Sequence, residues 1–164
     1  MLILTTGGTI DKVYFDALSR FQIGDSMVPA ILQEANVTSP LRIETLLRKD
    51  SLDLTDEDRA LIRETVIAAD EQRVLITHGT DTMVTTALSL LGLEEKTIVL
   101  TGALQPARLK STDAAFNLGF AMATARLAPA GVWIAMNGEV FDARAVVKDR
   151  EAGEFVRTEP MTPG

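Results

Sequence analysis

The sequence contains no cysteine, and only one histidine, one tyrosine and one tryptophan. Without cysteine, the chain can form no disulfide and has no thiol nucleophile. Its apolar runs are all too short to cross a bilayer. Residues 1–4 also lack the basic stretch with which a signal peptide begins. We therefore expect a cytoplasmic protein without a membrane segment.

Positive charge is scarce as well. Lysine and arginine together number 16, against 23 aspartates and glutamates, so the net charge is −7. Such a chain repels the phosphates of nucleic acids and anionic lipids, and we expect neither as a partner. Linkers, repeats and low-complexity segments are missing too. The composition, 46% hydrophobic and 24% charged over 164 residues, therefore predicts one globular domain over residues 1–155, with a flexible tail over residues 156–164.

Short apolar runs alternate with amphipathic segments along the chain. The runs predicted to form strands lie within residues 1–5, 41–47, 74–77, 97–101 and 132–136. The predicted helices lie within residues 26–35, 55–69, 83–91 and 113–127. This alternation predicts an α/β fold with a mostly parallel sheet covered by helices on both faces.

Local signals add detail at three places. Thr55 and Asp58 have the spacing of a capping box at the start of a helix. Asn137 and Gly138 predict a β-hairpin near the C-terminus. Residues 10–25 fit neither the helical nor the strand period, so we expect an irregular segment or a hairpin that acts as a lid.

Two predicted strands end in turns that are rich in glycine and hydroxyl groups. Residues 6–9 read Thr-Gly-Gly-Thr, and residues 78–82 read His-Gly-Thr-Asp-Thr. The carboxyl ends of parallel strands meet at one edge of a sheet, where ligands bind in open α/β folds. Glycine also lets a ligand approach the backbone closely. We therefore expect Thr9 and Thr80 to line one site.

A threonine hydroxyl becomes a nucleophile only when a base takes its proton. The candidate bases are Tyr14, Asp81 and Lys148, and a lysine can serve only while it is partly neutral. Hydroxyl, amine and carboxylate would then replace the hydroxyl, imidazole and carboxylate of serine hydrolases. Backbone N–H groups of the two turns could hold a developing oxyanion.

Each of these residues also has an ordinary structural alternative. Thr9 could be only a turn residue. Thr80 and Asp81 could cap the next helix. Lys148 lies among charged neighbours typical of a solvated surface, and Tyr14 could pack half-buried. A single histidine makes too sparse a ligand set for a metal, so no metal site is expected.

Taken together, the two turns resemble those of the bacterial-type L-asparaginase family, which includes the asparaginase-glutaminases. Residues 6–10 match the family's Thr-Gly-Gly-Thr-Ile turn, and residues 78–83 match its His-Gly-Thr-Asp-Thr-Met turn. Residues 101–106 and 142–148 give two weaker matches. The resemblance spans about residues 2–148, which correspond to the first domain of a two-domain family. It therefore implies a short, single-domain form.

The resemblance implies a role for each matched residue. Thr9 matches the primary nucleophile, and Tyr14 matches a lid tyrosine that assists it. Thr80, Asp81 and Lys148 match a second group that relays protons or activates water.

Substrate binding is implied in the same way. The matched positions are Gly8, Asp50, Ser51, Thr80, Asp81 and Ala103. Asp81 would receive the α-ammonium group, the loop of Asp50 and Ser51 would hold the α-carboxylate, and the Ala103 carbonyl would lie near the amide.

The implied reaction converts L-asparagine to L-aspartate and ammonia through an acyl-enzyme, with no cofactor. Weak or absent glutaminase activity and a homodimer or higher oligomer are also expected. Two alternatives remain open at this point. The chain could be an asparaginase-like subunit of an amidotransferase, or a non-catalytic module that binds an amino acid.

Overall fold

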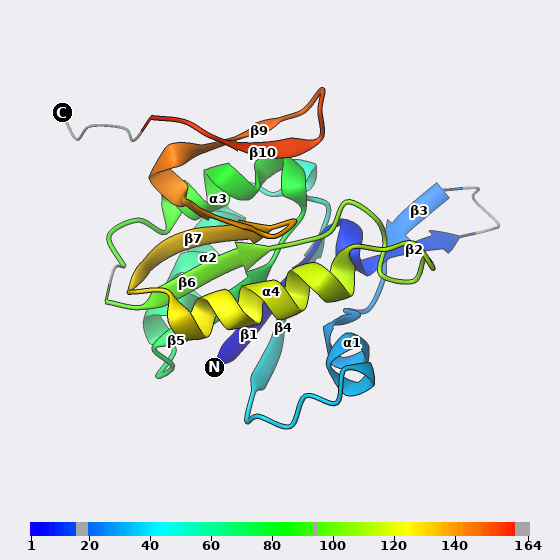
Figure 1. Cartoon of the computed structure of the whole chain (residues 1–164), viewed down its shortest axis with the longest axis horizontal. Helices are drawn as coiled ribbons and strands as arrows, with labels where there is room; N and C mark the ends of the chain where they lie inside the picture. Colours follow the sequence, from blue (N-terminus) through cyan, green and yellow to red (C-terminus); the bar gives the residue numbers. More distant parts are fainter. Residues whose placement is uncertain (16–19, 94, 160–164) are drawn as a thin grey trace.

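The computed structural model describes residues 1–15, 20–93 and 95–159 (Figure 1). Its centre is a six-stranded sheet in the order β4-β1-β5-β6-β7-β8. These strands are β1 (Leu2–Gly7), β4 (Arg42–Lys49), β5 (Arg73–Thr77), β6 (Thr97–Thr101), β7 (Gly131–Met136) and β8 (Glu139–Asp142). All neighbours run parallel except β7 and β8, which are antiparallel. The predicted α/β fold is confirmed.

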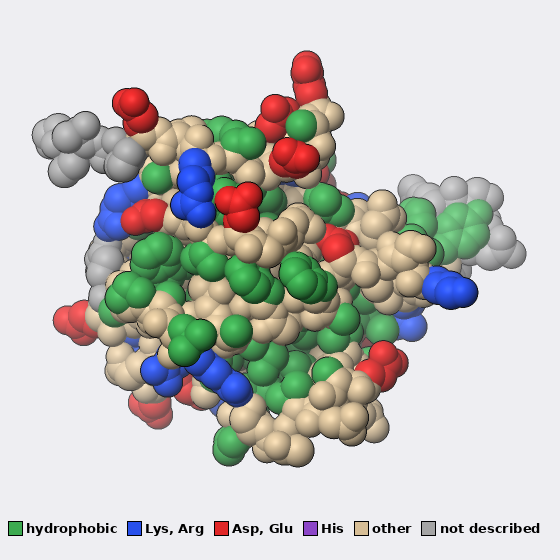
Figure 2. Space-filling view, viewed as in Figure 1, with side chains coloured by type: hydrophobic (Ala, Val, Ile, Leu, Met, Phe, Trp, Pro, Cys, Tyr) green, Lys and Arg blue, Asp and Glu red, His purple; other side chains and the backbone are tan. Residues whose placement is uncertain are grey.

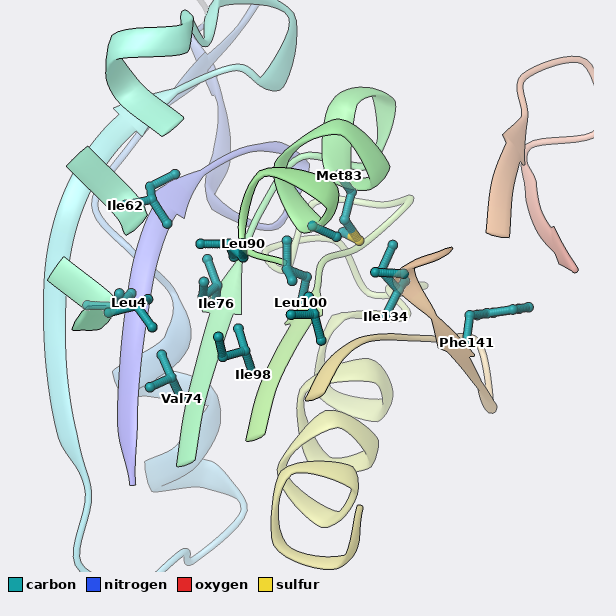
Figure 3. Packing of buried hydrophobic residues seen from close by; sticks show 14 of the residues in the cluster. Leu4, Ile62, Val74, Ile76, Met83, Leu90, Ile98, Leu100, Ile134 and Phe141 are labelled. Carbon is teal, nitrogen blue, oxygen red and sulfur yellow. The ribbon is translucent and has the colours of Figure 1, made fainter. Parts of the chain in front are cut away.

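Helices cover both faces of the sheet (Figure 1). The four helices described are α1 (Val28–Glu34), α2 (Asp56–Ala68), α3 (Met83–Ser89) and α4 (Ala114–Leu127). Successive strand residues point to opposite faces, so β1 supplies Leu4 to the core beneath α2 and α3, and Ile3 to the core beneath α1 and α4. Figure 3 shows the first of these cores, in which Leu4 and Ile76 pack with Ile62 of α2. Among the described helices, none combines the length and apolarity that crossing a bilayer needs.

The N-termini of α2 and α4 differ in whether a side chain caps the helix. The capping box at α2 is confirmed, because the Thr55 Oγ1 accepts from the Asp58 N–H at 3.3 Å and the Asp58 carboxylate accepts from the Thr55 N–H at 2.9 Å. Asp113 begins α4 without capping it through its side chain. Its carboxylate instead accepts the N–H groups of Leu104 and Gln105, each at 3.0 Å. Asp113 therefore fixes the loop after β6.

Two hairpins lie outside the six-stranded sheet (Figure 1). The arm consists of β2 (Lys12–Phe15) and β3 (Arg20–Ile23), within the segment for which a lid was predicted. The residues that connect its strands, 16–19, lie outside the described residues. The C-terminal hairpin consists of β9 (Val146–Asp149) and β10 (Glu154–Arg157). The predicted turn at Asn137 and Gly138 joins β7 to β8.

The end of the chain differs from the sequence prediction. Val156 and Arg157, assigned to a flexible tail, pair with Val147 and Val146 of β9. Backbone pairing therefore moves the start of any tail beyond Arg157. Residues 160–164 of the predicted tail lie outside the described residues.

Glycines allow the backbones to approach closely at the carboxyl edge of the sheet. Gly8 has a φ of +86°, and a Cβ built on it would lie 2.4 Å from the Gly79 nitrogen. Only glycine meets both requirements, because an L side chain is strained at this φ and no side-chain atom fits in the gap. Gly8 therefore brings the turn after β1 directly against the turn after β5.

Gly8→Ala tests this packing. With φ +86° and ψ −171°, the Gly8 backbone costs alanine about 1–3 kcal/mol, and the clash with Gly79 adds overpacking of about 1–3 kcal/mol. Urea unfolding should show a free energy of unfolding lowered by both terms. Gly153→Ala is the matched control, because Gly153 has a φ of +72° but a Cβ there would meet open space. The control should lose the first term alone, and equal losses in both variants would contradict the contact.

Candidate active site

Four loops converge at the carboxyl edge of the sheet, following β1, β4, β5 and β6. The parallel register aligns a threonine from each strand in one row: Thr45, Thr5, Thr77 and Thr101. Beyond this row, the Thr6 hydroxyl donates to the Thr77 carbonyl at 2.8 Å. With the contact between Gly8 and Gly79, this hydrogen bond holds the two glycine-rich turns together. The prediction that both turns share one edge is confirmed.

Lys148 reaches this edge from the C-terminal hairpin. Its Nζ donates to the Thr80 Oγ1 at 2.7 Å and to the Asp81 Oδ1 at 2.5 Å. Thr80 and Asp81 begin the 3-10 turn η4 (Thr80–Thr82) directly after β5. The Lys148 side chain is only 11% exposed, so it is not the solvated surface lysine that its charged neighbours suggested. Hydroxyl, amine and carboxylate therefore form one hydrogen-bonded cluster.

Thr9 is the first residue of the 3-10 turn η1 (Thr9–Asp11) and is partly exposed. Its neighbour Gly8 donates its N–H to the Lys49 carbonyl at 3.0 Å. The N–H of Gly8 is therefore already in use, and the space beside its Cα is filled by the Gly79 backbone. The turn that carries Thr9 lies against the turn that carries Thr80, because Gly8 touches Gly79.

Tyr14 occupies a different setting from the other predicted catalytic residues. It lies on β2 of the arm, and 52% of its surface is exposed. Its ring packs edge-on against Phe21 of β3, with 5.6 Å between the ring centroids. In this structure Tyr14 therefore packs within the arm.

The residues predicted to bind the α-carboxylate make internal contacts. The Asp50 carboxylate pairs with Lys12 Nζ at 2.8 Å and accepts the Leu52 N–H at 3.2 Å. Partial burial disfavours its charge, but these hydrogen bonds outweigh burial and hold the pKa of Asp50 below its usual value. Ser51 is 1% exposed, with its side chain against Gly79. Ser51 thus supports the turn after β5, whereas Asp50 ties the loop after β4 to Lys12 of the arm.

Ala103 is fully buried after β6. The loop around it is held on both sides, because Asp113 binds the N–H of Leu104 and the Asn117 amide donates to the Gly102 carbonyl at 3.0 Å. These bonds fix the backbone where the resemblance implies a carbonyl near the substrate.

His78 has a structural role that the sequence pattern did not indicate. Its ring is fully buried, and Nδ1 lies 2.7 Å from the Gly79 carbonyl. A carbonyl only accepts, so Nδ1 carries the proton and Nε2 accepts from the Thr86 hydroxyl at 2.8 Å. Burial lowers the pKa of the imidazole to about 4. Neutral His78 therefore braces the turn that precedes Thr80.

The sequence also gives no sign of a structural role for Asp11, because no local pattern indicates that a carboxylate two residues after Thr9 is buried. It is 1% exposed and accepts the Met27 N–H at 2.8 Å. Burial raises the pKa of Asp11 to about 6, although hydrogen bonds from Met27 and Ser26 act in the opposite direction. Its carbonyl also accepts the Gly24 N–H at 2.9 Å. Asp11 thus closes the base of the arm.

A hollow of about 590 Å³ opens between the arm and the loop after β4. Its lining includes Lys12, Phe21, Ile23, Arg48, Asp50 and Leu52. Across residues 1–15, 20–93 and 95–159, no group of three or more acidic or histidine side chains is placed to hold a metal ion. The clustered chemistry of this edge is that of Thr80, Asp81 and Lys148.

An open α/β sheet with hydroxyl, amine and carboxylate groups at its carboxyl edge has the layout of a small-molecule site. Residues 1–153 match the family model described as "Asparaginase, N-terminal". The chain therefore belongs to the asparaginase family.

Three relatives illustrate the match. A probable periplasmic L-asparaginase of Haemophilus influenzae is 35% identical over 158 residues, covering 89% of this chain and 45% of that protein. A glutamyl-tRNA(Gln) amidotransferase subunit from Saccharolobus islandicus is 33% identical, covering 88% and 35%. The solved thermostable L-asparaginase from Thermococcus kodakarensis superposes with a TM-score of 0.80 at 29% identity, covering 95% and 50%. The chain spans about half the length of these relatives, or less.

The shifted pKa values of Asp11 and His78 predict opposite effects of acid on the stability of the fold. The folded chain keeps His78 neutral down to about pH 4, whereas the ordinary pKa of histidine is 6.5. Between these two values the unfolded chain binds more protons than the folded chain, so acid destabilises the fold. Asp11 has its pKa raised from 3.8 to about 6, so the folded chain binds more protons there and acid stabilises it. Between pH 6.5 and 4.5 each effect amounts to about 2 kcal/mol.

Two variants separate these effects in urea unfolding at pH 6.5 and 4.5. Compared with wild type, Asp11→Asn should lose about 2 kcal/mol more stability on acidification, and His78→Gln should lose about 2 kcal/mol less. The difference between the two pH values is the relevant measurement, because both replacements also lower stability at neutral pH. Parallel pH dependence in all three proteins would contradict the buried settings of both groups.

Proposed function

We propose that this chain is an amidohydrolase that cleaves the side-chain amide of L-asparagine to give L-aspartate and ammonia. The observation that carries the proposal is Lys148, largely buried and bonded to Thr80 and Asp81 at the edge shared with the turn of Thr9. Membership of the asparaginase family supports the reaction class. The names of the Haemophilus and Thermococcus relatives support asparagine as the substrate.

In the proposed reaction, the Thr9 hydroxyl attacks the amide carbon. The new C–O bond forms, the C–N bond breaks, and the nitrogen leaves as ammonia with the proton from Thr9. Water then attacks the ester, which releases aspartate and restores the hydroxyl. Lys148 in its neutral form can accept the proton of the Thr80 hydroxyl, while Asp81 holds the amine in place. Thr80 thus relays a proton to or from the reacting groups.

Asp81 has a second part in the proposal, as the group that receives the substrate ammonium. Its side chain is 38% exposed, so one side remains open to a ligand while the other pairs with Lys148. Glutamine differs from asparagine by one methylene, which a pocket discriminates by about 1–3 kcal/mol. Weak glutaminase activity is therefore expected.

Ammonia release from asparagine and glutamine tests the proposal with Thr9→Ala, Thr80→Ala and the control Thr85→Ala. Thr85 is an exposed threonine of α3, so its replacement should leave turnover unchanged. Removing the nucleophile should lower kcat by about a thousandfold or more in Thr9→Ala. Mass spectrometry of quenched wild type should find an aspartyl ester on Thr9. A mild loss in Thr9→Ala with an ester on Thr80 would transfer the nucleophile to Thr80.

A second candidate function is the ammonia-producing subunit of an amidotransferase. It is favoured by the 33% identity to the Saccharolobus amidotransferase chain. Ammonia release by the purified chain alone favours the hydrolase, whereas activity that appears only with a partner chain favours this alternative. If asparagine raises the Tm but is never hydrolysed under either condition, the chain is a binding module.

We also propose that the chain forms a homodimer or higher oligomer. Figure 2 shows hydrophobic side chains gathered over the α4 side of the molecule. Phe116 and Leu127 of α4 are 60% and 84% exposed. Apolar surface of this kind marks association sites.

The cytoplasmic location stays a prediction, since the Haemophilus relative is named periplasmic.

Self-association can be checked by light scattering of the purified chain. The mass should be at least twice the 17.7 kDa of one chain at micromolar concentration. Leu127→Glu should lower this mass, because a charge at the most exposed apolar residue of α4 opposes burial of that surface. A wild-type mass of 17.7 kDa would contradict the proposal.

A further inference from the structure

Lys148 is held by a hairpin that is not part of the main sheet. β9 forms a two-stranded sheet of its own with β10, and Figure 1 shows this hairpin over α3. An inner strand of the six-stranded sheet would be fixed by its neighbours on both sides. The position of Lys148 depends instead on how the C-terminal hairpin is attached to the body.

Phe155 provides the first attachment. It lies directly opposite Lys148 in the antiparallel pair of β10 and β9. Opposite residues project from the same face, so Phe155 and Lys148 both face the body. Phe155 is 8% exposed, and its ring lies 6.3 Å from the ring of Phe141 on β8. Phe155 therefore anchors the strand position next to the lysine.

Arg157 provides the second attachment, two residues further along the same face of β10. Its guanidinium carbon lies 5.0 Å from the centroid of the Phe141 ring. One of its nitrogens donates to the Val140 carbonyl at 2.9 Å. Glu139 lies 3.5 Å from the same group. Arg157 thus binds both the backbone and an aromatic face of β8.

The space between these attachments and the end of the hairpin is hollow. A cavity of about 420 Å³ separates β8 from the connection between β9 and β10, and Phe141, Phe155 and Gly153 are among its lining residues. This hollow is open to solvent, because exposed residues such as Glu139 and Ala152 form part of its lining. The hairpin therefore has room to shift when Phe155 or Arg157 is removed.

We infer that Phe155 and Arg157 are positioning residues that hold Lys148 against Thr80 and Asp81. This inference rests on the proposed function, in which Lys148 handles protons. A displacement of about 1 Å in a catalytic group lowers turnover by about a hundredfold. Loss of either attachment should therefore lower kcat and expose the lysine, while substrate contacts made elsewhere hold KM nearly constant.

The test compares Phe155→Ala and Arg157→Ala with Val156→Ala. Val156 lies between them on the opposite face of β10 and is 38% exposed, so its replacement should change nothing. Both test variants should lower kcat by roughly 10- to 100-fold with KM within about twofold of wild type. Acetylation followed by mass spectrometry should label Lys148 several times faster. Lys96, bonded to the Ala69 and Glu71 carbonyls, serves as the internal reference.

Two features guard against misfolding. The conservative variant Phe155→Leu keeps the apolar contact and should restore most of the turnover. Arg157→Ala removes a side chain that is 62% exposed, so it should leave the fold intact. Unchanged labelling of Lys148 in Arg157→Ala and Phe155→Ala, or a loss of kcat without faster labelling, overturns the inference. If no protein releases ammonia, faster labelling still supports the anchoring role while the proposed function fails.

Discussion

The contact between the Gly8 and Gly79 backbones is the constraint on which the rest of the site depends. Parallel pairing of β1 with β5 aligns the two turns, but only the absence of side chains lets them touch. Thr9 and Thr80 follow these glycines directly. A site assembled in this way is rigid, because its two hydroxyl-bearing turns are fixed by backbone geometry and by the full burial of His78.

The second requirement is electrostatic. A largely buried ammonium group is costly unless hydrogen bonds and an opposite charge compensate for lost hydration. Lys148 finds both in Thr80 and Asp81. The same contacts that make its burial tolerable place its nitrogen beside the Thr80 hydroxyl, whose proton the neutral amine accepts in the proposed mechanism. Stability and proposed chemistry therefore depend on one set of atoms.

Much of the architecture could be predicted from the sequence, because buried parallel strands are continuous apolar runs and each run here ends at glycine or a polar turn. The capping box at Thr55 and the turn at Asn137 depend on local geometry, and both were predictable. The burial of Asp11 was not, since it arises from packing against Met27, a residue outside its own turn. The sequence did not indicate β10, because four residues of alternating pattern between a glycine and a nearby proline are typical of a frayed chain end. The roles expected for Lys148 and Thr80 came from the family resemblance. The hydrogen bond between them could be seen only in the structure.

The separation of the site's parts along the chain has a consequence for biosynthesis. Thr9 leaves the ribosome early, whereas Lys148 on β9 and the β10 strand that anchors it follow all six strands of the main sheet. The nascent chain can thus build most of its sheet before the amine joins the hydroxyls. Under the proposed mechanism, hydrolytic competence appears only once translation has passed Arg157, and fragments interrupted earlier remain inert toward free amino acids.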